Sequence, residues 1–155
     1  MAAEHLRGKK YMNAGAAIFL DTNILVYLHD ASEGEKHIRA KEIVNRYILV
    51  PDMILVSVQV LQEFYTTMIR KGGNPLFFRE VVEYYMLGTV ITNSCELMRR
   101  ALDIQEKFQL SFWDANIVAA AQAAGARELW TEDLNDGQDY GGVTAVNPFK
   151  LKNNL

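Results

Sequence analysis

The stretch Ala16-Ala17-Ile18-Phe19-Leu20-Asp21-Thr22-Asn23 decides the fold, because an apolar run passes directly into residues that favour the start of a helix. Its first five residues predict a short strand that is covered on both faces, as strands of a parallel sheet are. Comparable apolar runs follow at Met53–Ser57, Gly88–Thr92, Glu128–Thr131 and Val143–Val146. Strands of this kind predict the middle layer of an α/β domain.

Helical patterns occupy the segments between these runs, and their ends carry recognisable signals. Lys71-Gly72-Gly73-Asn74-Pro75 ends one helix with a basic residue and glycines, and it places proline at the start of the next. The predicted helices are Ile24–His29, Glu35–Tyr47, Val58–Lys71, Leu76–Met86, Cys95–Phe108 and Phe112–Ala124. Because strands and helices alternate along the chain, we expect a parallel sheet flanked by helices, in the α/β class.

The length of 155 residues, with 50% apolar and 23% charged residues, is typical of one globular domain. We expect this domain over residues 16–150, after a flexible, polar and basic N-terminal extension over residues 1–15 that lacks the apolar segment of a secretory signal. No stretch approaches the roughly 20 apolar residues of a membrane span, so no membrane association is expected. The single cysteine, Cys95, excludes an intramolecular disulfide and a cysteine-based zinc site, and it fits a cytoplasmic location; we expect it in the core.

The charge balance limits the ways in which this chain can bind nucleic acid. A net charge of −3 and an isoelectric point near 5.6 do not give the basic surface of a passive nucleic-acid-binding module. An enzyme that reaches nucleic acid through bound cations remains compatible with this balance.

Two acidic residues stand at places where a site can form. Asp21 follows the first predicted strand, and the carboxyl ends of parallel strands are where open α/β sheets build their sites. Considered alone, Asp21 is better explained as the cap of the helix after it. Glu63 lies six residues past Ser57, on the flank of an amphipathic helix, where it either extends over the sheet edge or remains a solvated side chain.

Two further acids occupy similar places later in the chain. Ser111-Phe112-Trp113-Asp114 matches the capping pattern that precedes a helix, and an acid in a first helical turn can cap and bind a metal together. Asp133 comes two residues after the strand-ending Thr131. Its neighbours Glu132 and Asp136 are equally well explained as members of a polar turn.

At least three of these acids follow a strand or open a helix beside one, so one edge of the sheet should gather about four carboxylates. Neighbouring anions raise each other's pKa values unless a cation neutralises them. Oxygen ligands without histidine or cysteine suit Mg²⁺ or Mn²⁺ and make zinc a poor fit. Such a site supports phosphodiester hydrolysis by a metal-activated water.

These residues resemble those of the PIN-domain family and, within it, the VapC-type toxins of type II toxin–antitoxin pairs. The resemblance extends over roughly Ala17 to Phe149. It rests on four motifs in order, with Val146-Asn147-Pro148-Phe149 closing the domain. The motifs are Phe19-Leu20-Asp21-Thr22-Asn23, Ser57-Val58-Gln59-Val60-Leu61-Gln62-Glu63-Phe64, Ser111-Phe112-Trp113-Asp114-Ala115 and Thr131-Glu132-Asp133-Leu134-Asn135-Asp136-Gly137-Gln138.

The resemblance implies a three-layer α/β/α fold around a mostly parallel sheet of four to five strands. It also implies a homodimeric endoribonuclease that uses Mg²⁺ or Mn²⁺, cleaves a tRNA or rRNA and is silenced by a cognate antitoxin. The implied catalytic and metal-binding residues are Asp21, Glu63, Asp114 and Asp133, with Asn23, Thr131 and Asp136 in supporting positions. Among Glu132, Asp133 and Asp136, Asp133 is taken as the fourth acid of the site because it lies two residues after Thr131, as the family pattern has it.

Two other functions have to be weighed against a ribonuclease. An aspartate at a strand end can be the nucleophile of a phosphatase, but Asp21-Thr22-Asn23 lacks the second aspartate of the D-x-D motif. A non-catalytic domain, receiver-like or scaffolding, would use the same acidic pocket to bind a metal and a protein partner. Such a scaffold would not cleave RNA, and it would keep its function after loss of Asp21.

Overall fold

Within residues 16–150, five short parallel strands form one sheet in the order β3-β2-β1-β4-β5. The structure is a computed structural model that describes residues 16–150, so the expected flexible extension over residues 1–15 lies outside the described residues. The strands are β1 (Ile18–Leu20), β2 (Ile54–Ser57), β3 (Thr89–Ile91), β4 (Glu128–Trp130) and β5 (Thr144–Val146).

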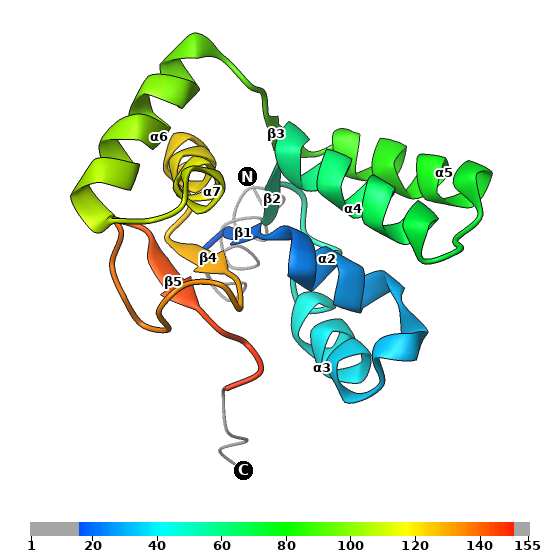
Figure 1. The fold of residues 1–155 in the computed structure, drawn as a ribbon. Helices are drawn as coiled ribbons and strands as arrows, with labels where there is room; N and C mark the ends of the chain where they lie inside the picture. Colours follow the sequence, from blue (N-terminus) through cyan, green and yellow to red (C-terminus); the bar gives the residue numbers. More distant parts are fainter. Residues whose placement is uncertain (1–15, 151–155) are drawn as a thin grey trace, which may run out of the picture.

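Helices cover both faces of this sheet. Figure 1 shows α6 and α7 on one side and α2 to α5 on the other. The described helices are α2 (Thr22–His29), η1 (Ala31–Glu33), α3 (Glu35–Val44), α4 (Val58–Arg70), α5 (Pro75–Met86), α6 (Cys95–Phe108) and α7 (Phe112–Ala123). The expected three-layer α/β/α arrangement around a parallel sheet is therefore confirmed.

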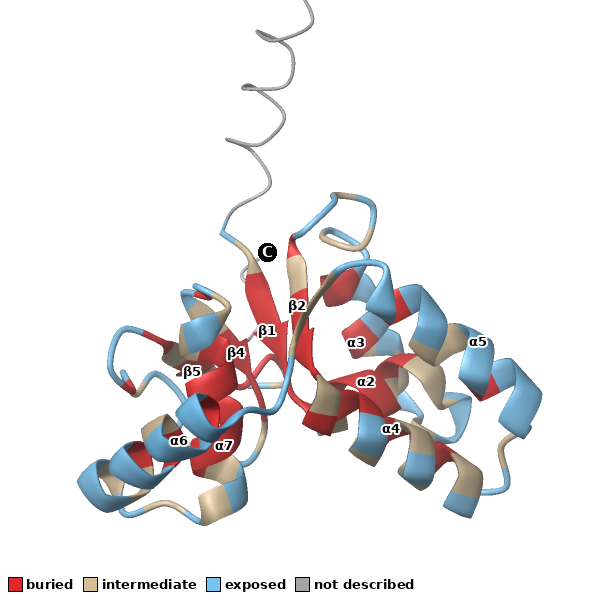
Figure 2. Cartoon of the chain, turned by 90° about the horizontal axis from the view of Figure 1, so that it is seen from above, coloured by how far each residue is buried: buried red, intermediate tan, exposed pale blue. Residues whose placement is uncertain are grey.

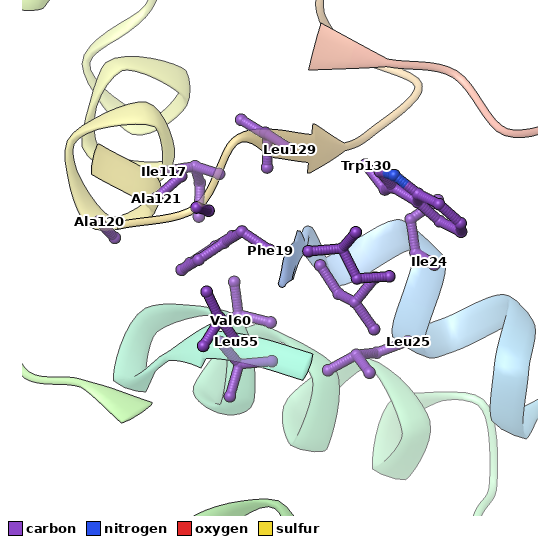
Figure 3. Packing of buried hydrophobic residues seen from close by; sticks show 14 of the residues in the cluster. Phe19, Ile24, Leu25, Leu55, Val60, Ile117, Ala120, Ala121, Leu129 and Trp130 are labelled. Carbon is purple, nitrogen blue, oxygen red and sulfur yellow. The ribbon is translucent and has the colours of Figure 1, made fainter. Parts of the chain in front are cut away.

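The core lies between the two helical layers and includes the central strands themselves. Phe19 and Leu129 are fully buried, and the strands β1, β2 and β4 appear as buried segments in Figure 2. On one face, Ile117, Ala120 and Ala121 of α7 pack on these strands, as Figure 3 shows. The small alanines let α7 approach the sheet closely, which explains why this helix is alanine-rich.

Most predicted boundaries are confirmed within one or two residues, which is the usual uncertainty of element ends. The helix expected to end at Tyr47 stops at Val44 instead, because the chain continues as turns in which Tyr47 and Ile48 donate to the Val44 carbonyl. The core position expected for Cys95 is wrong. Cys95 is exposed because α6 packs through Leu97, Ala101 and Ile104, which lie on a different face of the helix.

None of the helices within residues 16–150 has the length and apolar character needed to cross a lipid bilayer.

A half-buried histidine in the helical layer makes folding stability depend on pH. His29 packs against Phe64 and Tyr85, and burial lowers the pKa of its imidazole from 6.5 to about 4. The unfolded chain therefore takes up a proton at a higher pH than the folded protein does. The free energy of unfolding should fall by about 2 kcal/mol as the pH drops from about 6.5 to about 4.

Urea denaturation of wild type and His29→Gln across this pH range measures the effect. The variant cannot titrate at this position, so its free energy of unfolding should decline less over the same window. If the free energy of unfolding changed with pH in the same way for both proteins, the pKa of His29 would be the same in the folded and unfolded states, which would contradict the prediction.

Candidate active site

The sheet brings the residues after β1 and β4 side by side at its carboxyl edge. Leu20 pairs with Trp130, and the Asp21 N–H donates to the Trp130 carbonyl at 3.0 Å, so Asp21 lies next to Thr131. The strand order reverses between β1 and β4, since β2 and β3 lie beyond one and β5 beyond the other. Such a switch point is where open parallel sheets form their binding crevices.

Asp21 is the buried carboxylate of this edge, with 7% of the residue exposed. It caps α2, since Oδ1 accepts from the Thr22 N–H at 2.7 Å, and Oδ2 accepts from the Thr131 hydroxyl at 2.7 Å. Burial raises the pKa of Asp21 to about 6, and the charges of Asp133 and Glu63 contribute in the same direction, against these hydrogen bonds. Asp21 thus caps a helix and carries a negative charge in an unfavourable environment at the same time.

Thr131 connects Asp21 to Asp133. Its hydroxyl donates to Asp21 and accepts from the Asp133 N–H at 3.0 Å. On its other side, Asp133 Oδ2 accepts from Asn23 Nδ2 at 3.1 Å. Partial burial raises the pKa of Asp133, and the charges of Asp114, Glu132 and Glu63 add to the shift. The two supporting residues expected beside the acids, Asn23 and Thr131, are both in contact with them.

Glu63 is held on both oxygens by side chains from two helices. Oε2 accepts from the Thr22 hydroxyl at 2.7 Å, and Oε1 accepts from Gln59 Nε2 at 2.8 Å. The Gln59 amide oxygen in turn accepts from Asn116 Nδ2, which reaches it from α7. Gln59 and Asn116 are both buried, so this chain of hydrogen bonds fixes Glu63 from inside the protein.

Asp114 stands in the first turn of α7, where its N–H donates to the Ser111 hydroxyl at 3.1 Å. The capping role expected for this segment is therefore present. Asp114 is half-buried, and its charge raises the pKa of Asp133, which places the two carboxylates within electrostatic range. The charges of Glu63 and Asp114 thus reach the carboxylates at the carboxyl edge of β1 and β4.

The two remaining acids of the loop after β4 are engaged elsewhere. Glu132 forms an ion pair with Lys36 at 2.7 Å and accepts from the Tyr27 hydroxyl. Asp136, expected as a supporting residue, accepts from the Asn147 N–H at 2.8 Å and so holds the chain after β5. Of the three acids in this loop, Asp133 is the one that the structure places against Asn23 and the Thr131 hydroxyl.

The donor set suits a hard divalent cation. The acids supply carboxylate oxygens, and Asn23 Oδ1 is a buried oxygen with no hydrogen-bond partner among residues 16–150. Burial raises the pKa values of Asp21 and Asp133, and the charges of neighbouring acids add to the shift; a bound cation would offset both effects. Within residues 16–150, no three histidine, cysteine, aspartate or glutamate side chains lie close enough together to hold a metal ion as they stand. The carboxylates of Asp21, Glu63 and Asp133 instead accept hydrogen bonds from neighbouring groups, so a bound cation would have to draw these acids together.

The sequence did not point to Thr22, Gln59 and Asn116. Two weak signals exist, because Gln59 and Glu63 are one helical turn apart and Asn116 is a polar residue in an alanine-rich helix. Neither signal indicates which residue the side chain bonds. The contact between Gln59 and Asn116 spans 57 residues, so only the packed structure reveals it.

Comparison with known proteins gives relatives by family and by fold. No protein with a curated description matches the chain. Among solved structures, the Mycobacterium tuberculosis toxin VapC20, described as cleaving the sarcin-ricin loop, superposes with a TM-score of 0.60 at 22% identity, covering 76% of this chain and 92% of that chain. A toxin–antitoxin complex from Klebsiella pneumoniae contains a chain with a TM-score of 0.67 at 24% identity, covering 88% of this chain and 100% of that chain.

These two similarities concern the fold. The family assignment comes from the sequence, because the model of the PIN domain matches residues 18–135, well over half of the chain, and includes all four acids of the site. The matched segment begins at the first residue of β1 and ends in the loop after β4. This chain belongs to the PIN domain family.

Proposed function

We propose that this chain is a Mg²⁺- or Mn²⁺-dependent endoribonuclease that acts as the toxin of a toxin–antitoxin pair. The observation that carries the proposal is the environment of Asp21. Its carboxylate is buried at the switch point of the sheet, and two further carboxylates lie close enough to raise its pKa. Burying an anion among anions is costly for a purely structural cap, and it is useful where a divalent cation binds.

The residues of the site have different tasks in this proposal. Asp21, Asp133, Glu63 and Asp114 would hold a divalent ion, which when bound would supply a water of lowered pKa and neutralise charge on the leaving oxygen. Glu63 is oriented in advance, because both of its oxygens are already held. Asp133 is exposed and Asp114 half-buried, so the side of the site that they form is open to a substrate.

RNA is the proposed substrate and an antitoxin the proposed partner, in the cytoplasm. The net charge of −3 gives no general attraction for a polyanion, so bound cations would provide the contact with phosphate. The fold relatives are described as a toxin that cleaves the sarcin-ricin loop and as part of a toxin–antitoxin complex. They support an RNA target such as rRNA or tRNA, and an antitoxin that binds a homodimer of this chain.

Cation binding should depend on pH through Asp21. The carboxyl group has a pKa of about 6 in the folded protein, and a cation binds its ionised form. The affinity for Mn²⁺ should therefore be nearly constant above about pH 7 and fall as the pH drops through about 6. Isothermal titration calorimetry between pH 5 and pH 8 measures this, and an affinity that is unchanged across that range would contradict a role for the Asp21 carboxylate.

Incubation of purified protein with total RNA tests the proposed activity. Cleavage should occur with Mg²⁺ or Mn²⁺, stop when EDTA is in excess, and return when Mn²⁺ is added back. Discrete fragments, rather than progressive shortening from an end, would identify an endonuclease. Cleavage that continues in EDTA would exclude the mechanism, and RNA left intact under all conditions would favour a non-catalytic scaffold.

A further inference from the structure

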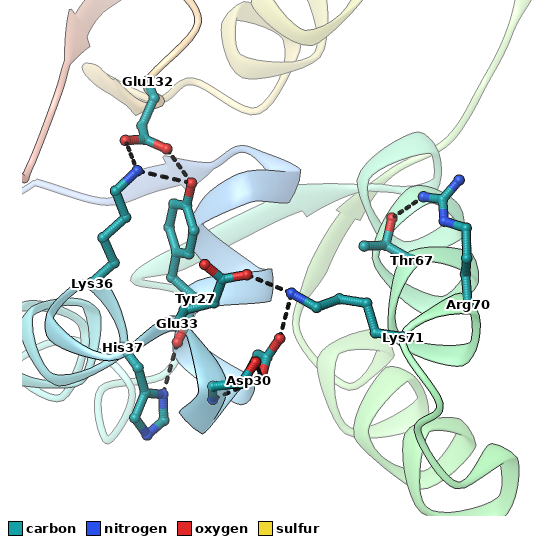
Figure 4. A network of polar contacts seen from close by, with 10 residues as sticks. Tyr27, Asp30, Glu33, Lys36, His37, Thr67, Arg70, Lys71 and Glu132 are labelled. Carbon is teal, nitrogen blue, oxygen red and sulfur yellow. Dashed lines mark hydrogen bonds and ion pairs between the residues drawn. The ribbon is translucent and has the colours of Figure 1, made fainter.

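A group of side chains beside the site forms contacts to which the proposed reaction assigns no role. Figure 4 shows Lys36 and Tyr27 meeting the carboxylate of Glu132. Lys36 Nζ lies 2.7 Å from Glu132 Oε2 and donates to the Tyr27 hydroxyl at 3.2 Å, while the Tyr27 hydroxyl donates to Glu132 Oε1. We call Tyr27, Lys36 and Glu132 the tether.

Aromatic rings fix the lysine of the tether in place. The Lys36 ammonium lies 4.7 Å from the centre of the Tyr27 ring and 5.7 Å from that of Phe149. The two rings contact each other edge to face, with their centres 5.2 Å apart. These contacts join α2, the first turn of α3, the loop after β4 and the segment after β5.

The tether acts on the residues that flank Glu132 in the chain. Thr131 bonds Asp21, and Asp133 bonds Asn23, whereas Glu132 between them is held by Tyr27 and Lys36. Asn23 and Tyr27 are one turn apart on α2 and so share a face of that helix. One face of α2 therefore holds two consecutive residues of the loop.

We propose that Tyr27 and Lys36 are positioning residues that hold the loop through Glu132 and thereby set the position of Asp133 for a divalent cation. The cation part of this inference rests on the proposed function, whereas the holding of the loop does not. Side chains that orient metal ligands from outside typically change metal affinity or activity by about tenfold to a hundredfold when they are replaced.

The tether is suited to a local task rather than to stabilising the whole fold. The side chains of Lys36 and Glu132 are 45% and 21% exposed, and ion pairs with such access to water contribute little to global stability. Loss of the tether should therefore loosen the loop while leaving the unfolding transition nearly unchanged. If the tether stabilised the fold as a whole, its loss would change both the mobility of the loop and the unfolding transition.

Two measurements on Lys36→Met and Tyr27→Phe test the proposal. The first is amide hydrogen exchange at Asp133, whose N–H donates to Thr131, and at Thr131, whose N–H donates to Val146. Exchange at both amides should be faster in the variants. The second is Mn²⁺ affinity by calorimetry, which should fall about tenfold in Lys36→Met.

Lys71→Met is the matched control. Lys71 also joins two segments by ion pairs, with Asp30 at 2.6 Å and with Glu33, but it contacts no residue of the loop (Figure 4). This variant should keep wild-type exchange at both loop amides and wild-type Mn²⁺ affinity. Lys36→Arg, which retains the charge, should have amide exchange rates and a Mn²⁺ affinity much closer to those of wild type than Lys36→Met has.

The outcomes separate the tether from the proposed function. Wild-type exchange rates at Asp133 and Thr131 in both tether variants would overturn the tether, whatever the protein does to RNA. Faster exchange with unchanged Mn²⁺ affinity would overturn the link to the cation. A wild-type protein that neither binds Mn²⁺ nor cleaves RNA would end the proposed function, and the exchange measurement would still decide whether the tether holds the loop.

Discussion

Asp21→Asn is expected to remove RNA cleavage and, at the same time, to make the protein more stable. Loss of cleavage is expected because the amide cannot supply the negative charge that binds the cation. Metal ions contribute several kcal/mol to such transition states, so we expect a fall of about a thousandfold or more, equivalent to about 4 kcal/mol. Single-turnover cleavage of a defined RNA with saturating Mn²⁺ measures this change.

The gain in stability also comes from removing the negative charge of Asp21. The Asp21 carboxyl has a pKa of about 6 in the folded protein and one near 3.8 in the unfolded chain. Its contribution to stability is therefore fully present below about pH 4 and is lost as the pH rises through about 6. Asparagine carries no charge at any pH, so at pH 8 the variant should be more stable by about 1 to 3 kcal/mol.

Asparagine can also keep much of the local geometry. Its amide oxygen can accept from the Thr22 N–H, and its amide nitrogen can donate to the Thr131 hydroxyl. Asp103→Asn, an exposed acid on α6, is the control and should change neither cleavage nor stability. If Asp21→Asn cleaves as wild type does, Asp21 is only a helix cap.

Thr131→Val is expected to weaken cation binding and cleavage by about tenfold to a hundredfold. Valine has nearly the same shape as threonine, but it removes the hydroxyl that donates to Asp21 and accepts from the Asp133 N–H. The hydrogen bond from Thr131 lowers the pKa of Asp21, so its loss should raise that pKa above 6. The variant should therefore bind Mn²⁺ with a pH dependence that is shifted to higher pH.

The same substitution should lower the free energy of unfolding. It leaves a buried oxygen of Asp21 without its partner, which costs about 1 to 3 kcal/mol. Thr89→Val is a suitable control, because the Thr89 hydroxyl also bonds an aspartate, Asp52 at 3.2 Å, but on β3 at the edge of the sheet. A Thr131→Val protein with an unshifted pH profile for Mn²⁺ would show that Thr131 does not tune Asp21.

The sheet was predictable from the sequence because its strands are covered on both faces. Such strands must be apolar almost throughout, and Ile18–Leu20 and Glu128–Trp130 stand out for this reason. The positions of Asp21 and Asp133 were predictable as well, because parallel strands bring the residues after their carboxyl ends to one edge of the sheet. Glu63 and Asp114 each had an adequate structural explanation alone; the recurrence of acids at strand ends and helix starts placed them in the site, and the family resemblance then matched them to the acidic quartet.

Features that depend on contacts between distant segments were not predictable. Thr22, which bonds Glu63, and Lys36, which bonds Glu132, lie on other helices far away in the sequence, and which side chains meet is decided by register and packing. The core position expected for Cys95 was wrong for a related reason. Cysteine is often buried, but α6 packs through the face that carries Leu97, Ala101 and Ile104, and Cys95 does not lie on that face.

Anomalous diffraction from crystals grown with Mn²⁺ tests most directly whether Asp21 anchors a divalent cation at the carboxyl edge of β1 and β4. We predict an anomalous peak within coordination distance of the Asp21 carboxylate and of at least one of Asp133, Glu63 and Asp114. Asp21→Asn crystals should show no such peak. A wild-type crystal with saturating Mn²⁺ and no peak at this edge would contradict the proposed role of Asp21.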